Sequence, residues 1–276
     1  MQDCHMQKLL NKINTGHWVV MGILNVTPDS FSDGGRFTRL DSALKHALQM
    51  KEDGAEIIDI GGESTRPGAV AVSLDEELER VIPVIEKIRQ HSDVAISIDS
   101  SKPQVMQAAL DAGANMVNDV NALHSDGAVA LCARYDVPVC LMHKQGDPQT
   151  MQDSPQYQDA VAEISRYLIA RAGVCIEAGI SKNNIIIDPG FGFGKNLENN
   201  LSLLRDMQQI CAIQYPVLVG ISRKSMFGML LGREVDERLA ASIAAVVIAY
   251  QKGARLFRVH DVAQTCDALK LCDAVA

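Results

Sequence analysis

Lys224, Arg258 and His260 are cationic residues at or just beyond the ends of two apolar runs, VLVGISRK and RLFRVH. Arg258 and His260 are two residues apart, so they share one face of an extended strand. Cationic side chains that converge in a cleft stabilise negative charge on phosphate oxygens. These three residues could therefore bind a pyrophosphate together with its metal ion. Taken singly, each could instead be a solvated surface residue.

Four further polar residues stand at the ends of apolar runs: Asn25, Asp99, Asn118 and Asp188. Asp99, Asn118 and Asp188 could hydrogen-bond a flat nitrogen heterocycle, because a carboxylate accepts two parallel N–H donors. The side-chain oxygen of Asn25 could bind Mg²⁺, which takes one or two protein oxygens and keeps water and phosphate oxygens as its other ligands. The alternatives are that Asp99 and Asn118 cap helices and that Asn25 belongs to a turn.

Two loops after apolar runs combine glycine with groups that could contact a ligand. DIGGESTRPG begins at Asp59, and beyond its glycines Ser64, Thr65 and Arg66 offer hydroxyls and a guanidinium to phosphate oxygens. A glycine turn with a solvated arginine is the alternative. The loop LNVTPDSFSDGG contains Phe31, an aromatic ring in a polar segment that could stack on a flat ligand.

The segment DPGFGFGK, residues 188–195, superficially resembles a phosphate-binding loop. A P-loop has four residues between its first glycine and the G-K pair, and Ser or Thr follows the lysine. Here three residues separate Gly190 from Gly194, and Asn196 follows the lysine. We interpret the segment as a turn that carries Asp188 and places Phe193 over the site.

The elements that must position these residues alternate along the chain. Apolar runs typical of buried strands occupy residues 18–25, 56–60, 94–99, 115–119, 137–143, 184–188, 217–224 and 255–260. Helical periodicity or helix-end signals mark residues 41–53, 74–90, 103–111, 128–135, 157–178, 197–211, 239–251 and 262–275. This alternation predicts an α/β fold, the (β/α)8 TIM barrel, whose site lies at the carboxyl ends of the strands. We expect residues 18–276 to form that single domain and residues 1–17 to be an N-terminal arm.

Composition limits the class of protein. The 276 residues are 47% hydrophobic and carry a net charge of −8, which disfavours a nucleic-acid-binding surface. No apolar run typical of a secretory signal occurs in the first seventeen residues, so we expect none, and the longest apolar run, 239–250, is too short to cross a bilayer. The seven cysteines show no C-x-x-C spacing, so we expect reduced cysteines in a cytoplasmic protein.

Residues 239–250 are apolar nearly all round, which exceeds the single stripe that packing on a barrel requires. We therefore expect the outer face of this helix to be covered by a second subunit of a two-fold homodimer. Burial by neighbouring helices of the same chain is the alternative.

Eight motifs occur in the order found in the dihydropteroate synthase family: LNVTPDSFSDGG, DIGGESTRPGA, SIDSSKPQV, NDV, LMHKQG, DPGFGFGK, GISRKS and RVHDV. The chain resembles this family from Trp18 to its last helix. The resemblance implies a TIM barrel, usually a homodimer, and a sulfonamide-sensitive transferase of folate biosynthesis. It implies the Mg²⁺-dependent condensation of 6-hydroxymethyl-7,8-dihydropterin diphosphate with 4-aminobenzoate, which yields 7,8-dihydropteroate and pyrophosphate.

The resemblance also implies a role for each matching residue, with Asn25 as the metal ligand. The implied pterin-binding residues are Asp99, Asn118, Met142, Asp188 and Lys224. The implied diphosphate-binding residues are Thr65, Arg258 and His260, beside which Arg66 is a candidate from its residue type. The implied aminobenzoate pocket consists of Phe31, Pro67, Phe193 and Ser225, and Asp33 resembles a loop residue that stabilises developing positive charge. The predicted catalytic residues are Asp33, Asp99, Lys224, Arg258 and His260.

Two positions depart from the family pattern, and three other functions fit part of it. Lys144 stands where the family often has Met, and Asn121-Ala122 stands where a pair such as Ser-Gly is common. A pterin-binding methyltransferase domain would share the barrel and pterin site, but would lack the diphosphate residues and the phenylalanine of the first loop. A Schiff-base aldolase would use Lys224 as its nucleophile. A non-catalytic pterin-binding paralogue would keep the fold and bind without turnover.

Overall fold

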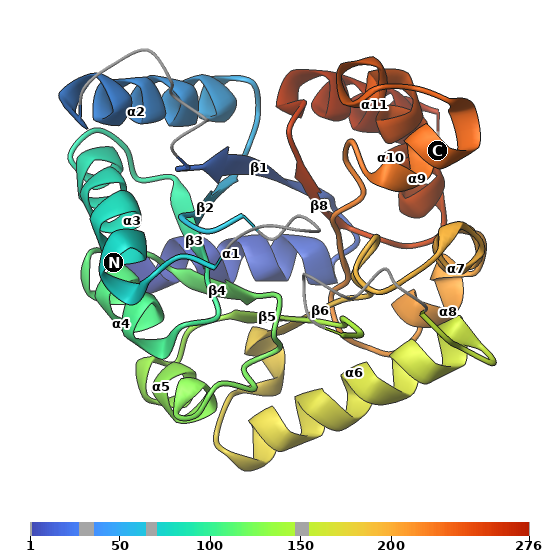
Figure 1. Cartoon of the computed structure of the whole chain (residues 1–276), viewed down its shortest axis with the longest axis horizontal. Helices are drawn as coiled ribbons and strands as arrows, with labels where there is room; N and C mark the ends of the chain where they lie inside the picture. Colours follow the sequence, from blue (N-terminus) through green and yellow to red (C-terminus); the bar gives the residue numbers. More distant parts are fainter. Residues whose placement is uncertain (1, 28–35, 65–70, 147–154, 276) are drawn as a thin grey trace.

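The chain forms a ring of eight parallel strands surrounded by helices (Figure 1). The structure is a computed structural model, and it describes residues 2–27, 36–64, 71–146 and 155–275. The strands are β1 (Val19–Asn25), β2 (Ile57–Gly61), β3 (Ala95–Asp99), β4 (Met116–Asp119), β5 (Val139–Met142), β6 (Ile185–Asp188), β7 (Leu218–Val219) and β8 (Leu256–Val259). They pair in the order β6-β5-β4-β3-β2-β1-β8-β7. A parallel bridge between Ile187 and Val217 joins the two ends of this order. The predicted (β/α)8 barrel is confirmed.

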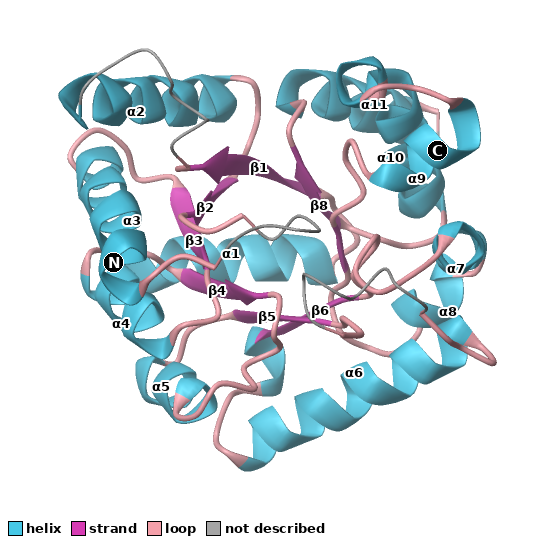
Figure 2. Ribbon diagram, viewed as in Figure 1, coloured by secondary structure: helices cyan, strands magenta, loops and turns pink. Residues whose placement is uncertain are grey.

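Helices follow the strands around the outside of the ring (Figure 2). Those within the described residues are α1 (Gln2–Asn14), α2 (Arg36–Glu52), α3 (Leu74–Arg89), α4 (Pro103–Asp111), α5 (Ala128–Tyr135), α6 (Ala160–Glu177), α7 (Leu197–Arg205), α8 (Met207–Cys211), α9 (Ser225–Leu231), α10 (Leu239–Gln251) and α11 (Val262–Ala274). Two 3₁₀ helices, η2 (Lys182–Asn184) and η3 (Val235–Glu237), complete the description.

Two expected elements differ from the structure. The helix expected over 197–211 is two helices, because Asp206 has φ −108° and ψ 20° and interrupts the helical backbone between α7 and α8. The strand expected over 217–224 is only Leu218–Val219. Its polar end turns instead, since Arg223 takes a left-handed φ of 57° and Lys224 then caps α9.

The interior of the ring is a separate apolar cluster from the layer between strands and helices. Its strand members include one residue or two from every strand: Val19, Met21, Ile57, Ala95, Met116, Cys140, Ile186, Leu218 and Leu256. Residues from all eight strands can meet only inside the barrel. The same cluster contains Met6, Leu9, Leu10 and Ile13 of α1, so α1 packs against the amino-terminal end of the barrel. The segment expected to be an arm is therefore largely helical.

Alternate strand residues point outward and pack beneath the helices. Helix α3 illustrates why such a segment is helical. Ser73 caps its start by accepting a hydrogen bond from the Glu76 backbone, and acidic residues in its first turn interact favourably with the helix dipole. Val81, Ile85 and Ile88 recur at helical spacing and are fully buried. Burial of each such side chain stabilises the fold by about 1.5–3 kcal/mol.

Two expectations from composition can be compared with the described part of the chain. Its cysteines with described side chains are free: Cys132, Cys140, Cys175, Cys211, Cys266 and Cys272. None of the helices within the described ranges combines the length and the hydropathy needed to cross a membrane.

Candidate active site

Polar side chains converge at the carboxyl ends of β3 to β6. Asp99 on β3 lies level with Asn118 on β4, and Met142 on β5 lies level with Asp188 on β6. All four side chains are buried. The structure thus brings together four of the five residues that sequence analysis assigned to pterin binding.

Arg258 reaches this group across the barrel from β8. Its Nε donates to Oδ2 of Asp59 at 2.6 Å, and its Nη2 donates to Oδ2 of Asp99, also at 2.6 Å. Asn118 Nδ2 donates to the same oxygen of Asp59 at 3.1 Å. Sequence analysis grouped Arg258 with the diphosphate residues, whereas its ion pairs join it to a residue of the pterin group.

Asp59 is the residue of this network that sequence analysis missed. Its position inside β2, rather than at the strand end, left it without an assigned role. A signal was present, because a carboxylate within a fully buried parallel strand requires a cation or several donors as partners. Asp59 is fully buried, and its Oδ1 has no hydrogen-bond partner among the described residues.

Burial sets the protonation of the two carboxylates that face the site. It raises the pKa of Asp99 to about 7, against the opposite effect of Arg258 and with a further increase from Asp59. It raises the pKa of Asp188 to about 6, opposed by a 2.7 Å hydrogen bond from the Gly190 backbone and by the charge of Lys224. Asp188 is thus largely ionised at neutral pH and can accept N–H donors from a ligand.

Lys224 lies beside the loop that follows β6. Its Nζ is 4.1 Å from the centroid of the Phe193 ring, a cation–π contact. Ser225 is exposed and begins α9 directly after Lys224. The structure therefore brings Phe193 and Lys224 into contact from two different loops, and Ser225 follows Lys224 at the start of α9.

His260 and Asn25 lie at the ends of neighbouring strands, β8 and β1. His260 Nδ1 is 3.0 Å from the hydroxyl of Ser222, and the His260 backbone donates to the same hydroxyl at 3.3 Å. Asn25 is half-buried beside Gly61. The other predicted residues, Phe31, Asp33, Thr65, Arg66 and Pro67, lie outside the described residues.

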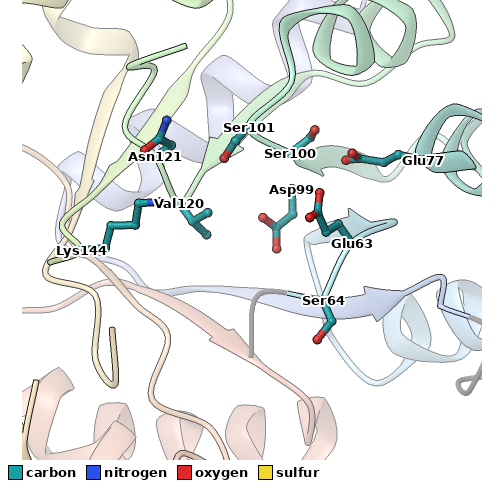
Figure 3. Close-up of a pocket in the computed structure, with 9 residues that line it drawn as sticks. All are labelled: Glu63, Ser64, Glu77, Asp99, Ser100, Ser101, Val120, Asn121 and Lys144. Carbon is teal, nitrogen blue, oxygen red and sulfur yellow. The ribbon is translucent and has the colours of Figure 1, made fainter. Parts of the chain in front are cut away.

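A cavity of about 200 Å³ opens between the ends of β2 and β5 (Figure 3). It is lined by Glu63, Ser64, Glu77, Asp99, Ser100, Ser101, Val120, Asn121 and Lys144. Lys144 and Glu77 lie on opposite sides of it in Figure 3. Lys144 and Asn121, the first residue of the Asn121-Ala122 pair singled out in sequence analysis, thus line the space next to Asp99.

The side chains at the strand ends fit a magnesium ion that is coordinated mainly by a bound phosphate compound and by water. Within the described ranges, no three His, Cys, Asp or Glu side chains converge to hold a metal. Asn25 lies at the end of β1, and its side-chain oxygen would be a single hard ligand there. Mg²⁺ commonly accepts such a partial protein site and completes its shell with water and phosphate oxygens.

The closed barrel and the Asp, Asn and Arg side chains at its strand ends are the features expected of a pterin-binding enzyme. Residues 21–260 match the family described as pterin binding enzyme. The chain is 52% identical over 262 residues to the dihydropteroate synthase of Escherichia coli K12, covering 95% of this chain and 93% of that protein. It is 51% identical over 257 residues to the Haemophilus influenzae enzyme, covering 93% and 94%. The chain therefore belongs to the dihydropteroate synthase family.

Solved structures of this family share the fold. Dihydropteroate synthase of Xanthomonas albilineans with 4-aminobenzoic acid superposes with a TM-score of 0.89 at 51% identity, covering 94% of this chain and 93% of that one. The Yersinia pestis enzyme in a sulfonamide drug complex gives 0.89 at 49% identity, covering 94% of each. The Xanthomonas enzyme with 7,8-dihydropteroate gives 0.86 at 48% identity, again covering 94% of each.

Proposed function

We propose that this chain condenses 6-hydroxymethyl-7,8-dihydropterin diphosphate with 4-aminobenzoate to form 7,8-dihydropteroate and pyrophosphate. The observation that carries the proposal is its 52% identity to the Escherichia coli dihydropteroate synthase over nearly the whole of both chains. The geometry supports it, because Asp99, Asn118 and Asp188 lie buried together at one end of the barrel.

The pterin is held by the buried groups at the ends of β3 to β6. Asp188 accepts N–H donors from the amino-pyrimidine edge of the ring, while Asn118 and Asp99 contact its other polar atoms. Arg258 fixes Asp99 through its ion pair and holds Asn118 indirectly through Asp59. A charge network of this kind holds the ring in one orientation before reaction.

In the reaction, the bond between the pterin methylene carbon and the diphosphate oxygen breaks, and the oxygen keeps the electron pair. The amine nitrogen of 4-aminobenzoate supplies its lone pair to that carbon and then loses a proton. Positive charge on the pterin is stabilised by the carboxylates of Asp99 and Asp33. Negative charge on the leaving diphosphate is stabilised by Lys224, Arg258 and His260. No protein nucleophile is required.

The remaining predicted residues complete the two outer subsites. Thr65 and Arg66 contact diphosphate oxygens, and Asn25 would hold the Mg²⁺. When bound, Mg²⁺ supplies positive charge next to the diphosphate oxygens. Phe31, Pro67, Phe193 and Ser225 surround the aminobenzoate ring, and Met142 lines the pterin pocket. Exclusion of water by these groups prevents hydrolysis of the diphosphate from competing with the amine.

The outer surface of α9, η3 and α10 supports a homodimer. Its exposed large apolar side chains are Met229, Leu230, Leu231, Val235, Leu239 and Ile248. Apolar groups gathered on one surface favour association with a second copy. We place the enzyme in the cytoplasm, and sulfonamides, which resemble 4-aminobenzoate, would bind in the aminobenzoate subsite.

Pyrophosphate release tests the proposal. The purified chain should release pyrophosphate from the pterin diphosphate when 4-aminobenzoate and Mg²⁺ are present, and the release should stop when a chelator removes the metal. Circular dichroism should show an unchanged fold in the chelator. A non-catalytic paralogue would bind a pterin in calorimetry and release nothing, and that result would sink the proposed activity.

A further inference from the structure

Lys195, the last residue of the DPGFGFGK segment, is fully buried beside the site. Its Nζ lies 2.8 Å from the carbonyl oxygen of Gly190, 2.9 Å from that of Phe193 and 3.1 Å from Nδ1 of His143. The carbonyl oxygen of His143 is slightly farther away, at 3.3 Å. An ammonium has three N–H donors, and the three shortest contacts match them in number.

The Lys195 ammonium joins two loops that lie directly against each other. Gly190 and Gly194 both take left-handed φ values, of 69° and 61°. A Cβ on Gly190 would collide with the carbonyl oxygen of His143, and a Cβ on Gly194 would collide with that of Gln145. The loop after β6 therefore rests on the backbone of the loop after β5, and the Lys195 side chain lies between them.

Two other side chains hold the same loop. Asn200 on α7 accepts a 2.8 Å hydrogen bond from the Gly192 backbone and donates to the Lys195 carbonyl at 3.1 Å. The Tyr157 hydroxyl donates to the carbonyl oxygen of Gly194 at 2.9 Å. The backbone on both sides of Phe193 is thus held by hydrogen bonds.

A buried cation is costly at this position. Burial lowers the pKa of Lys195 to about 7, although Asp188 raises it, and the charge of Lys224 lowers it further. Burial and the charge of Lys195 lower the pKa of His143 to about 3, so its imidazole is neutral, and Nδ1 accepts from the ammonium in the tautomer that carries its proton on Nε2. An apolar residue of similar size would avoid this cost but would remove the lysine donor from the carbonyl oxygens of Gly190 and Phe193, and among the described residues the Gly190 oxygen would keep only the Phe193 backbone N–H at 3.1 Å.

We propose that Lys195 is a positioning residue, whose ammonium fixes the loop after β6 and thereby places Phe193 and Asp188 for the two substrates. Phe193 is the central residue of the loop, with its ring against Lys224. Gly190 connects the lysine to Asp188, because its carbonyl accepts from Lys195 and its N–H donates to Asp188 Oδ1. The inference rests on the proposed function, which assigns Phe193 to the aminobenzoate and Asp188 to the pterin.

Two variants of different severity test the inference. Lys195→Gln removes the charge and at least one donor. Tyr157→Phe removes only the hydroxyl that binds Gly194 and leaves the buried cation in place. Tyr135→Phe is the matched control, since the Tyr135 hydroxyl binds Asp111 on the surface, away from the loop. Pyrophosphate release from the unaltered enzyme is measured first, so that failure of the proposed function is recognised separately.

In Lys195→Gln, kcat/KM for 4-aminobenzoate should fall about tenfold or more, mainly through a higher KM, and a pterin analogue should bind more weakly. Tyr157→Phe should shift the same KM in the same direction by about two- to fivefold, the effect of one hydrogen bond. Tyr135→Phe should match the unaltered enzyme. Wild-type KM values and pterin affinity in Tyr157→Phe and in folded Lys195→Gln would overturn the inference. If Lys195→Gln does not fold, wild-type KM values in Tyr157→Phe alone would do so.

Discussion

Asp59 and Arg258 form an ion pair between strands that flank β1: Nε of Arg258 on β8 donates to Oδ2 of Asp59 on β2 at 2.6 Å. The exposed fraction of the Asp59 side chain is 0% and that of Arg258 is 20%, so water screens the pair little. Arg258 makes a second ion pair through Nη2, which donates to Oδ2 of Asp99 at 2.6 Å. Two carboxylates, Asp59 and Asp99, therefore hold the guanidinium.

Asp59→Asn should lower the free energy of unfolding by about 3 kcal/mol, because it leaves the buried guanidinium with one carboxylate instead of two. Urea denaturation measures the change. Asp93→Asn is the control, since Asp93 pairs with Lys51 on the surface and its side chain is 89% exposed. Such exposed pairs contribute little, so this variant should unfold at nearly the wild-type urea concentration. Equal effects in both variants would contradict the role of the buried pair.

Asp188→Asn should weaken binding of a pterin analogue by about 1.5–3 kcal/mol, because an amide offers one acceptor oxygen where the carboxylate offers two. Isothermal titration calorimetry gives the affinity directly. Asp111→Asn, at the surface end of α4, should bind the analogue as the unaltered protein does. Unchanged affinity in Asp188→Asn would remove this residue from the pterin site.

Pterin affinity should decrease as the pH falls from about 7 to 5. The pKa of Asp99 is raised to about 7 and that of Asp188 to about 6, so both carboxylates gain protons across this range. A protonated carboxyl is a poorer acceptor for ligand N–H groups than a carboxylate. Calorimetry at a series of pH values checks this, and the Asp188 contribution should vanish in Asp188→Asn. A constant affinity from pH 5 to 8 would show that neither carboxylate receives the ligand.

Arg258→Ala should slow turnover roughly 10²–10³-fold if Arg258 stabilises charge that develops in the transition state. If it only positions the bound substrate, KM should rise while kcat stays constant. Because the substitution leaves Asp59 and Asp99 without their cation, circular dichroism and thermal melting must accompany the kinetics. Unchanged kcat and KM in a folded variant would show that the leaving-group site is placed wrongly.

Light scattering at micromolar concentration should give a mass of twice 30.0 kDa, the mass of one chain. Leu230→Glu, which puts a charge on the exposed apolar surface of α9, should shift the mass towards that of one chain. Ile169→Glu, on the exposed side of α6, is the matched control and should leave the mass unchanged. A monomer mass for the unaltered protein would defeat the homodimer proposal.

Most of the barrel could be predicted from sequence because buried parallel strands form continuous apolar runs, and glycines or capping residues mark the helix ends. The strand expected over 217–224 was too long, because Arg223 in GISRKS has a left-handed backbone that residue types alone do not indicate. Helix α1 was missed although Met6, Leu9, Leu10 and Ile13 follow helical spacing. Its apolar face has a partner only once the barrel exists.

Residues at strand ends could be predicted from sequence, whereas residues that act through distant partners could not. Asp99 and Asp188 end their strands and Asn118 is the penultimate residue of β4, so their positions alone indicated that they face a ligand. Asp59 and Lys195 act through partners that only folding reveals. Asp59 pairs with Arg258, which is 199 residues away in the chain, and Lys195 binds backbone carbonyls, which carry no signal in a sequence.

Helix α1 covers the amino-terminal end of the barrel. Leu10 and its apolar neighbours pack against the amino-terminal strand ends, and apolar side chains from all eight strands fill the barrel interior. Because that interior is filled, both substrates and both products must enter and leave at the carboxyl-terminal end of the barrel, where Asp188 and Phe193 lie. Entry and release of ligands at this end, and not passage along the barrel axis, therefore govern how the site is occupied and vacated.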